Sequence, residues 1–308
     1  MGPIVGRQDL GIGNNFLRFI AQPLGTDFKK KRVITIGRQT NYASNDVQDQ
    51  FLEFGGFSKK KEVVPAEGDV AYFDEIFDKV YQDCDIDSID YSDFEGASVV
   101  HDLNCEIPPD LREQYDVLID GGTAEHIWDV KRTFFNYLSL VKPNGHLFIN
   151  VPANNQFGHG FYQFSAEFFF SFFTENYGCE VVTAVLDVHP YLGGELASGK
   201  LYEVESPLKI GERVVLCNKK PTSILVHIRK LKAVDLGSQT PPIQSDYSSR
   251  YEENSGQPLR RSVVFKLKLK GLFKKIPKKL QNHIIGLGQR AYYSTWNRKL
   301  FKKWRAPF

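Results

Sequence analysis

The chain has 308 residues, with 39 Lys and Arg, 37 Asp and Glu, and a formal net charge of +2. Hydrophobic residues make up 42% of it and aromatic residues 13%, which excludes a disordered, a collagen-like or a disulfide-stapled small protein. The near-neutral total hides a segregation of charge, because residues 259–308 hold 15 basic and no acidic residues. The first 258 residues hold 24 basic and 37 acidic residues, so an acidic body precedes a basic extension. The longest apolar run is also far shorter than the roughly 20 residues that a membrane-spanning helix needs.

The cysteines give no sign of a metal site. None of the four forms a CxxC pair or has a histidine at ligand spacing, so we predict no metal site. We interpret Cys84, Cys105, Cys179 and Cys217 as buried thiols of a reducing compartment. Residues 1–6 show neither a signal pattern nor the residue that N-myristoylation needs, which favours a cytoplasmic protein.

Strands and helices alternate along most of the chain. A short helix is predicted over 15–20, in a lead-in of residues 1–30. Apolar, β-branched runs predict strands at 32–37, 88–90, 97–100, 115–119, 146–151, 180–187, 213–217 and 223–229. Apolar residues at helical spacing or a good N-cap predict helices at 44–54, 69–81, 125–141 and 165–177. This order is typical of an α/β protein with a Rossmann-like, doubly wound sheet, mostly parallel and ending in an antiparallel hairpin.

Composition divides the chain into four parts. Residues 1–30 are the lead-in, and 31–232 form the α/β domain. Residues 233–258 are rich in Ser, Gln, Pro, Gly and Tyr and are predicted to be a linker. Residues 259–308 are the basic C-terminal extension.

Polar and small residues stand just past the strands of the predicted sheet. Ligands bind outside the carboxyl ends of the strands in an open α/β sheet, so these residues are the candidate ligand contacts. A glycine lets a ligand approach the backbone, one carboxylate can accept both hydroxyls of a ribose, and another can accept an adenine amino group. The residues are Gly37, Arg38, Asp90, Asp102, Leu103, Asp120 and Gly121. Together they indicate a nucleoside ligand.

Two stretches of the sequence carry a family resemblance, 115–126, YDVLIDGGTAEH, and 140–149, LVKPNGHLFI. They resemble the class I S-adenosylmethionine-dependent methyltransferases, and the resemblance covers about residues 30–230. The first stretch is similar to the family's fourth strand and the "EH" start of the next helix, and the second is similar to the turn from that helix into the fifth strand. The segment 154–165 resembles a bacterial subgroup of methyltransferase-like proteins. The resemblance implies the Rossmann-like methyltransferase fold, S-adenosylmethionine as cofactor and methyl transfer to a small-molecule acceptor, which we expect to be an oxygen of a sugar or related metabolite.

The resemblance also implies roles for the strand-end residues. Carried over by position, Gly37 is the first glycine of the cofactor loop and Asp90 holds the ribose hydroxyls. Asp102 and Leu103 frame the adenine. The methionine portion and the methyl group lie beside Asp120 and Gly121. Arg38 is available to pair with the cofactor carboxylate.

Two features depart from the family pattern. The glycine-rich loop reads GRQTN over 37–41 and keeps only the first glycine. Only eleven residues separate Asp90 from Asp102, too few for the usual intervening helix, and a tight turn over 94–96 is predicted instead. These departures support an alternative function, a non-catalytic methyltransferase-like module that binds a partner or serves as a scaffold.

Two histidines are candidate catalytic bases, because neutral imidazole accepts a proton near pH 7. His126 follows the fourth strand and His159 lies in the loop after the fifth, where a substrate would enter. A structural role in capping or hydrogen bonding is the alternative for each, and it is favoured for His101 and His189. The Phe-rich segment 157–173 is predicted to pack in the core, with its loop part available to line an acceptor pocket.

The basic extension alternates lysines with apolar residues over 263–276. Three interpretations stay open: a solvated extension, a segment that docks on an anionic membrane surface, and a nucleic-acid-binding segment. The acidic body disfavours nucleic acid as a partner. Membrane docking would make the cytoplasmic protein peripheral at the membrane.

Overall fold

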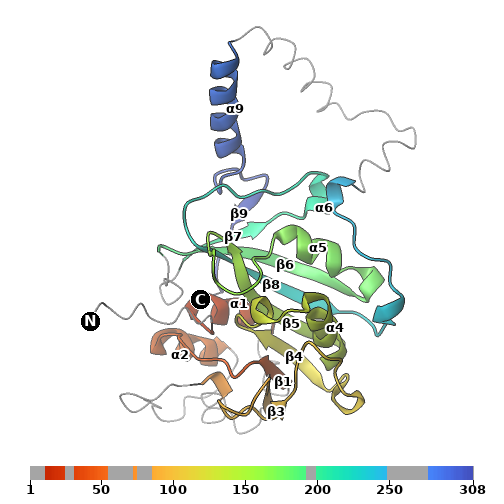
Figure 1. Ribbon diagram of the computed structural model, residues 1–308. Helices are drawn as coiled ribbons and strands as arrows, with labels where there is room; N and C mark the ends of the chain where they lie inside the picture. Colours follow the sequence, from red (N-terminus) through yellow and green to blue (C-terminus); the bar gives the residue numbers. More distant parts are fainter. Residues whose placement is uncertain are drawn as a thin grey trace.

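The computed structural model describes residues 11–24, 31–54, 72–74, 85–191, 199–247 and 277–307, and these build one mixed β-sheet with helices on both faces (Figure 1). The strands are β1 (Arg32–Ile36), β2 (Asp85–Asp90), β3 (Val99–Val100), β4 (Tyr115–Asp120), β5 (Val141–Asn154), β6 (Cys179–Val188), β7 (Lys200–Val204), β8 (Thr222–Lys230) and β9 (Phe301–Lys303). The α-helices are α1 (Asn14–Leu24), α2 (Asn45–Phe54), α4 (Val130–Leu140), α5 (Ala166–Phe172), α6 (Pro207–Ile210) and α9 (Lys278–Tyr292). Single 3-10 turns are η2 (Pro109–Leu111), η3 (Ala124–His126), η4 (Glu175–Tyr177) and η6 (Leu236–Ser238).

The strand order β3-β2-β1-β4-β5-β8-β6-β7-β9 confirms the predicted Rossmann-like fold. Strands β1 to β5 are parallel, and the chain winds outward from β1 in both directions. Ile36 at the end of β1 pairs with Ile89 on one side and with Asp120 on the other. The carboxyl ends of β1, β2 and β4 therefore lie side by side at the switch point of the sheet, where α/β proteins bind ligands.

The strands alternate between two apolar layers because successive side chains point to opposite faces of a sheet. In β4, Leu118 joins the core under α4 and α5, while Val117 and Ile119 join the core under α1 and α2. Phe134 of α4 is the centre of the first layer and makes ring contacts at centroid distances of 5.1–6.1 Å. Its partners are Phe164, Phe168, Phe169, Phe172 and Phe173. The predicted core role of the Phe-rich helix is thus confirmed.

Several predicted elements differ from the structure. The strand predicted at 213–217 is wrong: this stretch is irregular, and the amide of Cys217 donates to the carbonyl of Tyr293 at 2.7 Å. The place beside β6 is taken by β7, an amphipathic strand that the sequence analysis missed. The helix predicted from 125 begins only at Val130, because Asp129 caps it by accepting the amide of Arg132. The predicted turn over 94–96 is confirmed, with Gly96 at φ +78°.

Two further predictions concern the helix at 69–81 and the burial of the cysteines. The helix predicted over 69–81 lies, apart from residues 72–74, outside the described residues. The interpretation of the cysteines as buried is confirmed for Cys179 and wrong for Cys105 and Cys217, which are exposed because both stand on irregular segments. Cys84 lies outside the described residues.

The segments on either side of the α/β domain also contact it. In the predicted lead-in, α1 buries one face against the sheet, with Phe16, Phe19 and Ile20 at most 2% exposed. At the other end, β9 pairs antiparallel with β7, and Phe301 is 1% exposed. Between β8 and the chain end, α9 stands away from the body (Figure 1). None of the helices in the described ranges is long and apolar enough to cross a bilayer.

Replacing Phe301 by alanine is expected to lower the free energy of unfolding by about 3 kcal/mol, because removal of a buried phenylalanine leaves a cavity. Urea denaturation of the full chain measures the change. Trp296→Ala serves as the control, since Trp296 is 89% exposed and such surface changes stay within about 0.5 kcal/mol. Equal effects of the two substitutions would contradict the packing of β9 against the sheet.

Candidate active site

Gly37 and Asp90 meet at the carboxyl edge of the sheet. Gly37 follows β1 with φ +71°, a conformation that side chains rarely adopt, and its amide donates to the carbonyl of Ile89 at 2.7 Å. A Cβ atom added at Gly37 would lie 3.6 Å from Asp90 Oδ2 and 3.1 Å from Thr123 Oγ1. The backbone of Gly37, the Asp90 carboxylate and the Thr123 hydroxyl therefore border one small region.

The other residues of the altered glycine loop are held by the protein itself. The Arg38 guanidinium forms an ion pair with Asp74 at 3.0 Å, donates to the carbonyl of Glu95 at 2.7 Å and lies over the ring of Tyr72. Arg38 is thus tied to its own neighbours. Gln39 is buried and donates to the carbonyl of Ile36, and a Cβ atom on Gly121 would collide with its Oε1.

Asp120 is a fully buried anchor of the turn after β4. Its Oδ1 accepts the amides of Gly122 and Thr123 at 3.0 and 2.7 Å. Its Oδ2 accepts the amide of Ala124 at 3.2 Å and the hydroxyl of Tyr137 at 2.9 Å. Burial raises the pKa of Asp120, and these hydrogen bonds oppose the shift. The carboxylate is thereby committed to holding the turn, while Gly121 faces Gln39.

Asp102 and Leu103 lie on the loop that follows β3. The amide of His101 donates to the carbonyl of Asp90 at 2.8 Å, which places Asp102 one residue beyond the Asp90 strand end. Hydrogen bonds from the backbone and side-chain amides of Asn104 lower the pKa of Asp102. Leu103 is 5% exposed, and its carbonyl accepts a hydrogen bond from Asn136. Asp102 is therefore a charged loop residue, and Leu103 belongs to the core.

The two candidate histidines lie together, and Glu125 joins them. The rings of His126 and His159 have centroids 5.2 Å apart. Glu125 Oε1 lies 3.4 Å from His159 Nε2 and 3.9 Å from His126 Nε2. The side chain of Glu125 is 0% exposed, that of His159 is 9% exposed and that of His126 is 52% exposed. The cluster is thus open to solvent on the His126 side only.

Backbone hydrogen bonds hold the two parts of this cluster in place. The amides of Phe161 and Tyr162 donate to the carbonyl of Glu125 at 2.7 and 3.3 Å. Gly160 has φ +69°, and a Cβ atom there would lie 2.8 Å from that carbonyl oxygen, so only glycine permits the approach. The loop after β5 is consequently fastened to η3, which carries Glu125 and His126.

Burial raises the pKa of Glu125 to about 7; the contact with His159 opposes the shift, and the charge of Asp120 adds to it. Its Oε2 accepts no hydrogen bond from any residue that the structure describes. An ionised carboxylate buried in this way is costly unless a cation or donor compensates it. The cluster can therefore take up a proton near neutral pH.

Exposed aromatic rings flank the cluster. Trp128 is 71% exposed and Phe161 is 63% exposed, and they meet edge to face at 5.6 Å. The hydroxyl of Tyr162 donates to the carbonyl of Trp128, which links the two segments. Flat apolar rings beside a polar cluster suit a ligand that has one apolar face.

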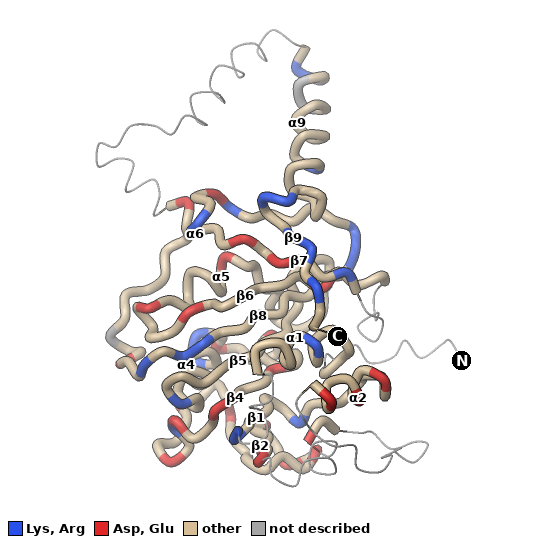
Figure 2. Tube along the Cα trace, turned by 180° about the vertical axis from the view of Figure 1, so that it is seen from behind, with Lys and Arg blue, Asp and Glu red and all other residues tan. Residues whose placement is uncertain are grey.

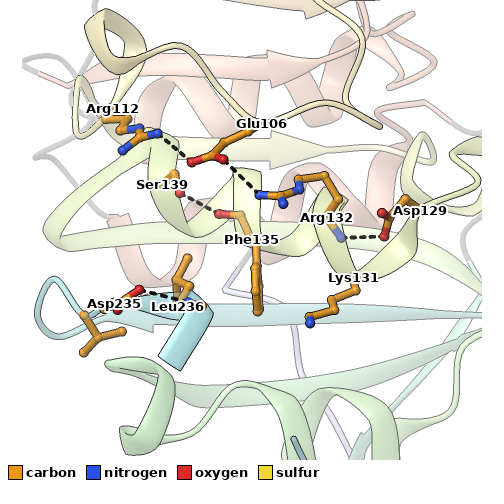
Figure 3. Close-up of a pocket in the computed structure, with 11 residues that line it drawn as sticks. Glu106, Arg112, Asp129, Lys131, Arg132, Phe135, Ser139, Asp235 and Leu236 are labelled. Carbon is orange, nitrogen blue, oxygen red and sulfur yellow. Dashed lines mark hydrogen bonds and ion pairs between the residues drawn. The ribbon is translucent and has the colours of Figure 1, made fainter. Parts of the chain in front are cut away.

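A separate cavity of about 480 Å³ runs along the outer side of α4 (Figure 3). Its charged groups are largely paired: Glu106 contacts Arg112 at 2.6 Å and Arg132 at 3.6 Å, and Asp129 caps α4. None of the strand-end residues lines it. We therefore place the candidate site at the carboxyl edge of the sheet and outside this cavity.

A second group of polar residues has the order of a nucleophilic triad. His189 Nε2 lies 2.6 Å from Ser223 Oγ, and His189 Nδ1 lies 3.8 Å from Asp187 Oδ1. Ser223 is 0% exposed within β8, and burial lowers the pKa of His189 to about 4. The hydroxyl is closed to a substrate, so this group is structural, as the sequence analysis favoured for His189.

The comparisons with known proteins concern the fold. No family model and no curated protein matches the chain. Similar solved structures include 1,6-didemethyltoxoflavin-N1-methyltransferase of Burkholderia thailandensis with bound S-adenosylhomocysteine, at 10% identity, 71% of this chain, 80% of that chain and a TM-score of 0.36. A SAM-dependent methyltransferase of Thermotoga maritima matches at 12% identity, 70% and 97% coverage and a TM-score of 0.34. A branched-chain polyamine synthase of Thermus thermophilus is 12% identical, and the match covers 74% of this chain and 59% of that chain with a TM-score of 0.35.

Several of the similar solved structures are methyltransferases by name. Identities of 9–12% leave this a likeness of fold only. The assignment of the fold itself follows from the strand order of the chain, in which parallel strands wind outward from β1. The chain is thus a Rossmann-like α/β protein with a polar site at the switch point of its sheet.

Replacing Glu125 by glutamine is expected to change how stability depends on pH. Because burial raises the pKa of Glu125 from its ordinary 4.5 to about 7, the stability that its neutral form contributes is complete below pH 4.5 and is lost as pH rises through 7. Glu125→Gln removes this loss. The difference in unfolding free energy should therefore move in favour of the variant by about 1 to 3 kcal/mol between pH 5 and pH 8.

Urea unfolding with a metal chelator present measures this difference at each pH. Glu53→Gln, at an exposed position of α2, is the matched control and should give a flat difference. A pH-independent difference for Glu125→Gln would show that the buried carboxyl has an ordinary pKa.

Proposed function

We propose that this chain binds S-adenosylmethionine at the carboxyl edge of its parallel strands and transfers the methyl group to an oxygen of a small molecule, a sugar or related metabolite. The observation that carries the proposal is the meeting of Gly37, in a left-handed conformation, with the Asp90 carboxylate at the switch point. A bare backbone turn beside a carboxylate at this place suits a nucleoside with ribose hydroxyls.

The residues present fit the cofactor in part. Gly37 offers a surface without a side chain, and Asp90 offers acceptors for the ribose hydroxyls. Gln39 Oε1 is buried beside Gly121 and has no hydrogen-bond partner among the described residues. A buried oxygen without a donor costs about 1–3 kcal/mol, and an ammonium group that reached it would compensate that cost. Arg38, paired with Asp74, is not needed in this arrangement.

The cluster beside this region supplies the base that an oxygen acceptor needs. S-adenosylmethionine provides an electrophilic methyl group, and the acceptor hydroxyl must lose its proton as the new bond forms. His126 is the member of the cluster that faces solvent. Its ring centroid lies 5.2 Å from that of His159, and its Nε2 lies 3.9 Å from Glu125 Oε1. The rings of Trp128 and Phe161 would bind the apolar face of the acceptor.

A non-catalytic binding module is the alternative, and one observation favours it. The side chain of Gln39 fills the space in front of Gly121, so a cofactor that lies against this glycine requires Gln39 to turn away. If it does not turn, the fold serves to bind another molecule. The two functions differ in whether S-adenosylmethionine binds at all.

Asp90→Ala is expected to weaken the binding of S-adenosylhomocysteine about 10- to 100-fold, because the ribose hydroxyls lose a charged hydrogen-bond acceptor. Isothermal titration of the full chain with S-adenosylmethionine and S-adenosylhomocysteine measures this. Asp93→Ala, an exposed carboxylate three residues further along the chain, is the matched control and should bind as the wild type does.

Three outcomes separate the alternatives. Neither heat nor thermal stabilisation with either ligand would exclude the methyltransferase and favour the binding module. Equal binding by wild type and Asp90→Ala would refute the site while leaving the function standing. Tighter binding by Gln39→Ala would identify Gln39 as an obstacle, and weaker binding would identify it as a contact.

For the basic extension we propose docking on an anionic membrane surface, which would make the protein peripheral at the membrane. In α9, Leu280, Ile284 and Leu287 stand at helical spacing on one face and are 39–54% exposed. Lys and Arg lie at both ends of α9 and along the chain through β9 (Figure 2). An apolar stripe flanked by basic residues binds anionic bilayers through both burial and charge.

Replacing Leu280, Ile284 and Leu287 by serine is expected to reduce sedimentation with phosphatidylserine vesicles at least about tenfold. Substitution is preferable to deletion, because β9 belongs to the sheet. The matched control replaces the polar residues His283 and Gln289 by serine and should sediment normally. Unchanged sedimentation of the apolar variant refutes the proposal, and salt-sensitive binding to DNA without vesicle binding would favour nucleic acid.

A further inference from the structure

We propose that Glu125, His126 and His159 bind a divalent transition metal ion, for which Zn²⁺ is the best match. The three residues each offer one ligand atom, and these atoms lie within 4.8 Å of one another. The inference concerns the cluster alone and stands independently of the proposed methyl transfer.

The distances in the cluster are close to those that a metal requires. Zinc bound to nitrogen and oxygen at about 2.0–2.1 Å in a tetrahedron keeps its ligand atoms about 3.3–3.4 Å apart. His159 Nε2 lies 3.4 Å from Glu125 Oε1, which already equals such an edge. His126 Nε2 lies 3.9 Å from the same oxygen, so a small rotation of an exposed ring completes the arrangement.

The donor set selects the kind of metal. Two imidazoles and one carboxylate suit Zn²⁺, Co²⁺ or Fe²⁺, whereas Mg²⁺ and Ca²⁺ prefer oxygen ligands only. Three protein ligands leave a fourth position open, as in catalytic zinc sites. His126 is 52% exposed, so solvent reaches the cluster from the His126 side.

The buried carboxylate of Glu125 favours a bound cation, and backbone hydrogen bonds join the segments that carry the ligands. Glu125 is 0% exposed, and a dication beside it would offset the cost of burying its charge. The loop of His159 is fastened to the backbone of Glu125 by the amides of Phe161 and Tyr162, and Gly160 allows the close approach. The segments that carry Glu125 and His159 are therefore fastened together by the fold.

A bound metal would change what the site does. The two histidines would then act as ligands and not as bases, and a water molecule bound together with them would lose a proton more readily.

Titration of the chelator-treated full chain with Zn²⁺, and with Co²⁺ followed by visible absorption, tests the proposal. We expect one equivalent per chain and the intense visible bands of tetrahedral Co²⁺. His159→Asn and His126→Asn should each weaken binding at least about tenfold. His283→Asn, a histidine on the exposed face of α9, is the matched control and should bind normally. Mg²⁺ should not compete.

Measurements on the wild type keep the test decisive if a variant fails to fold. Zn²⁺ should raise the thermal midpoint, and it should protect His126 and His159, but not His283, from diethylpyrocarbonate. The proposal is overturned if no ion binds, if His159→Asn and His126→Asn bind as tightly as wild type, or if Co²⁺ gives a strong near-ultraviolet thiolate band. Such a band would place the ion on a cysteine, for example the exposed Cys105 or Cys217.

Discussion

The buried carboxylate of Asp120 is the interaction on which the candidate site depends. It gathers the amides of Gly122, Thr123 and Ala124 and the hydroxyl of Tyr137 around one fully buried group. The turn that results brings the Thr123 hydroxyl to the carbonyl of Ile36 at 2.7 Å, so the ends of β4 and β1 are joined. It also starts η3, whose Glu125 receives the loop after β5. Asp120, which the sequence resemblance places beside the cofactor, thus holds the turn that positions Thr123 and Glu125.

Much of the fold could be predicted because its signals are local. A buried parallel strand such as β1 or β4 is a short β-branched run that needs no partner to be visible in the sequence. The antiparallel half was harder. Apolar and polar residues are mixed in the stretch 200–204, and β9 has only three residues inside a basic segment. The place of β7 beside β6, and of β9 beside β7, therefore depends on long-range pairing. In contrast, the stretch 213–217 has the composition of a strand, but the amide of Cys217 donates to the carbonyl of Tyr293.

The candidate site shows the same division. The meeting of Gly37 with Asp90 could be predicted from the rule that strand ends share an edge. The pairing of Arg38 with Asp74 could not, because their interaction needs the contact between two loops. The sequence indicates His126 and His159 as two independent candidate bases, and Glu125 stands out only as part of the motif 115–126. Thirty-two residues separate the histidines in sequence, so no spacing rule for metal ligands or bases could join them; the one local signal is the position of His159 between Gly158 and Gly160.

The strand β9 has a consequence for the outer edge of the sheet. An edge strand leaves unpaired amide and carbonyl groups that can recruit another chain and lead to aggregation. Here the edge beside β7 is covered by only three residues, of which Lys302 and Lys303 are exposed. At the opposite edge, β3 has just two residues. A three-residue edge strand with two exposed lysines disfavours edge-to-edge pairing with the sheet of another molecule, and the basic extension supplies this strand.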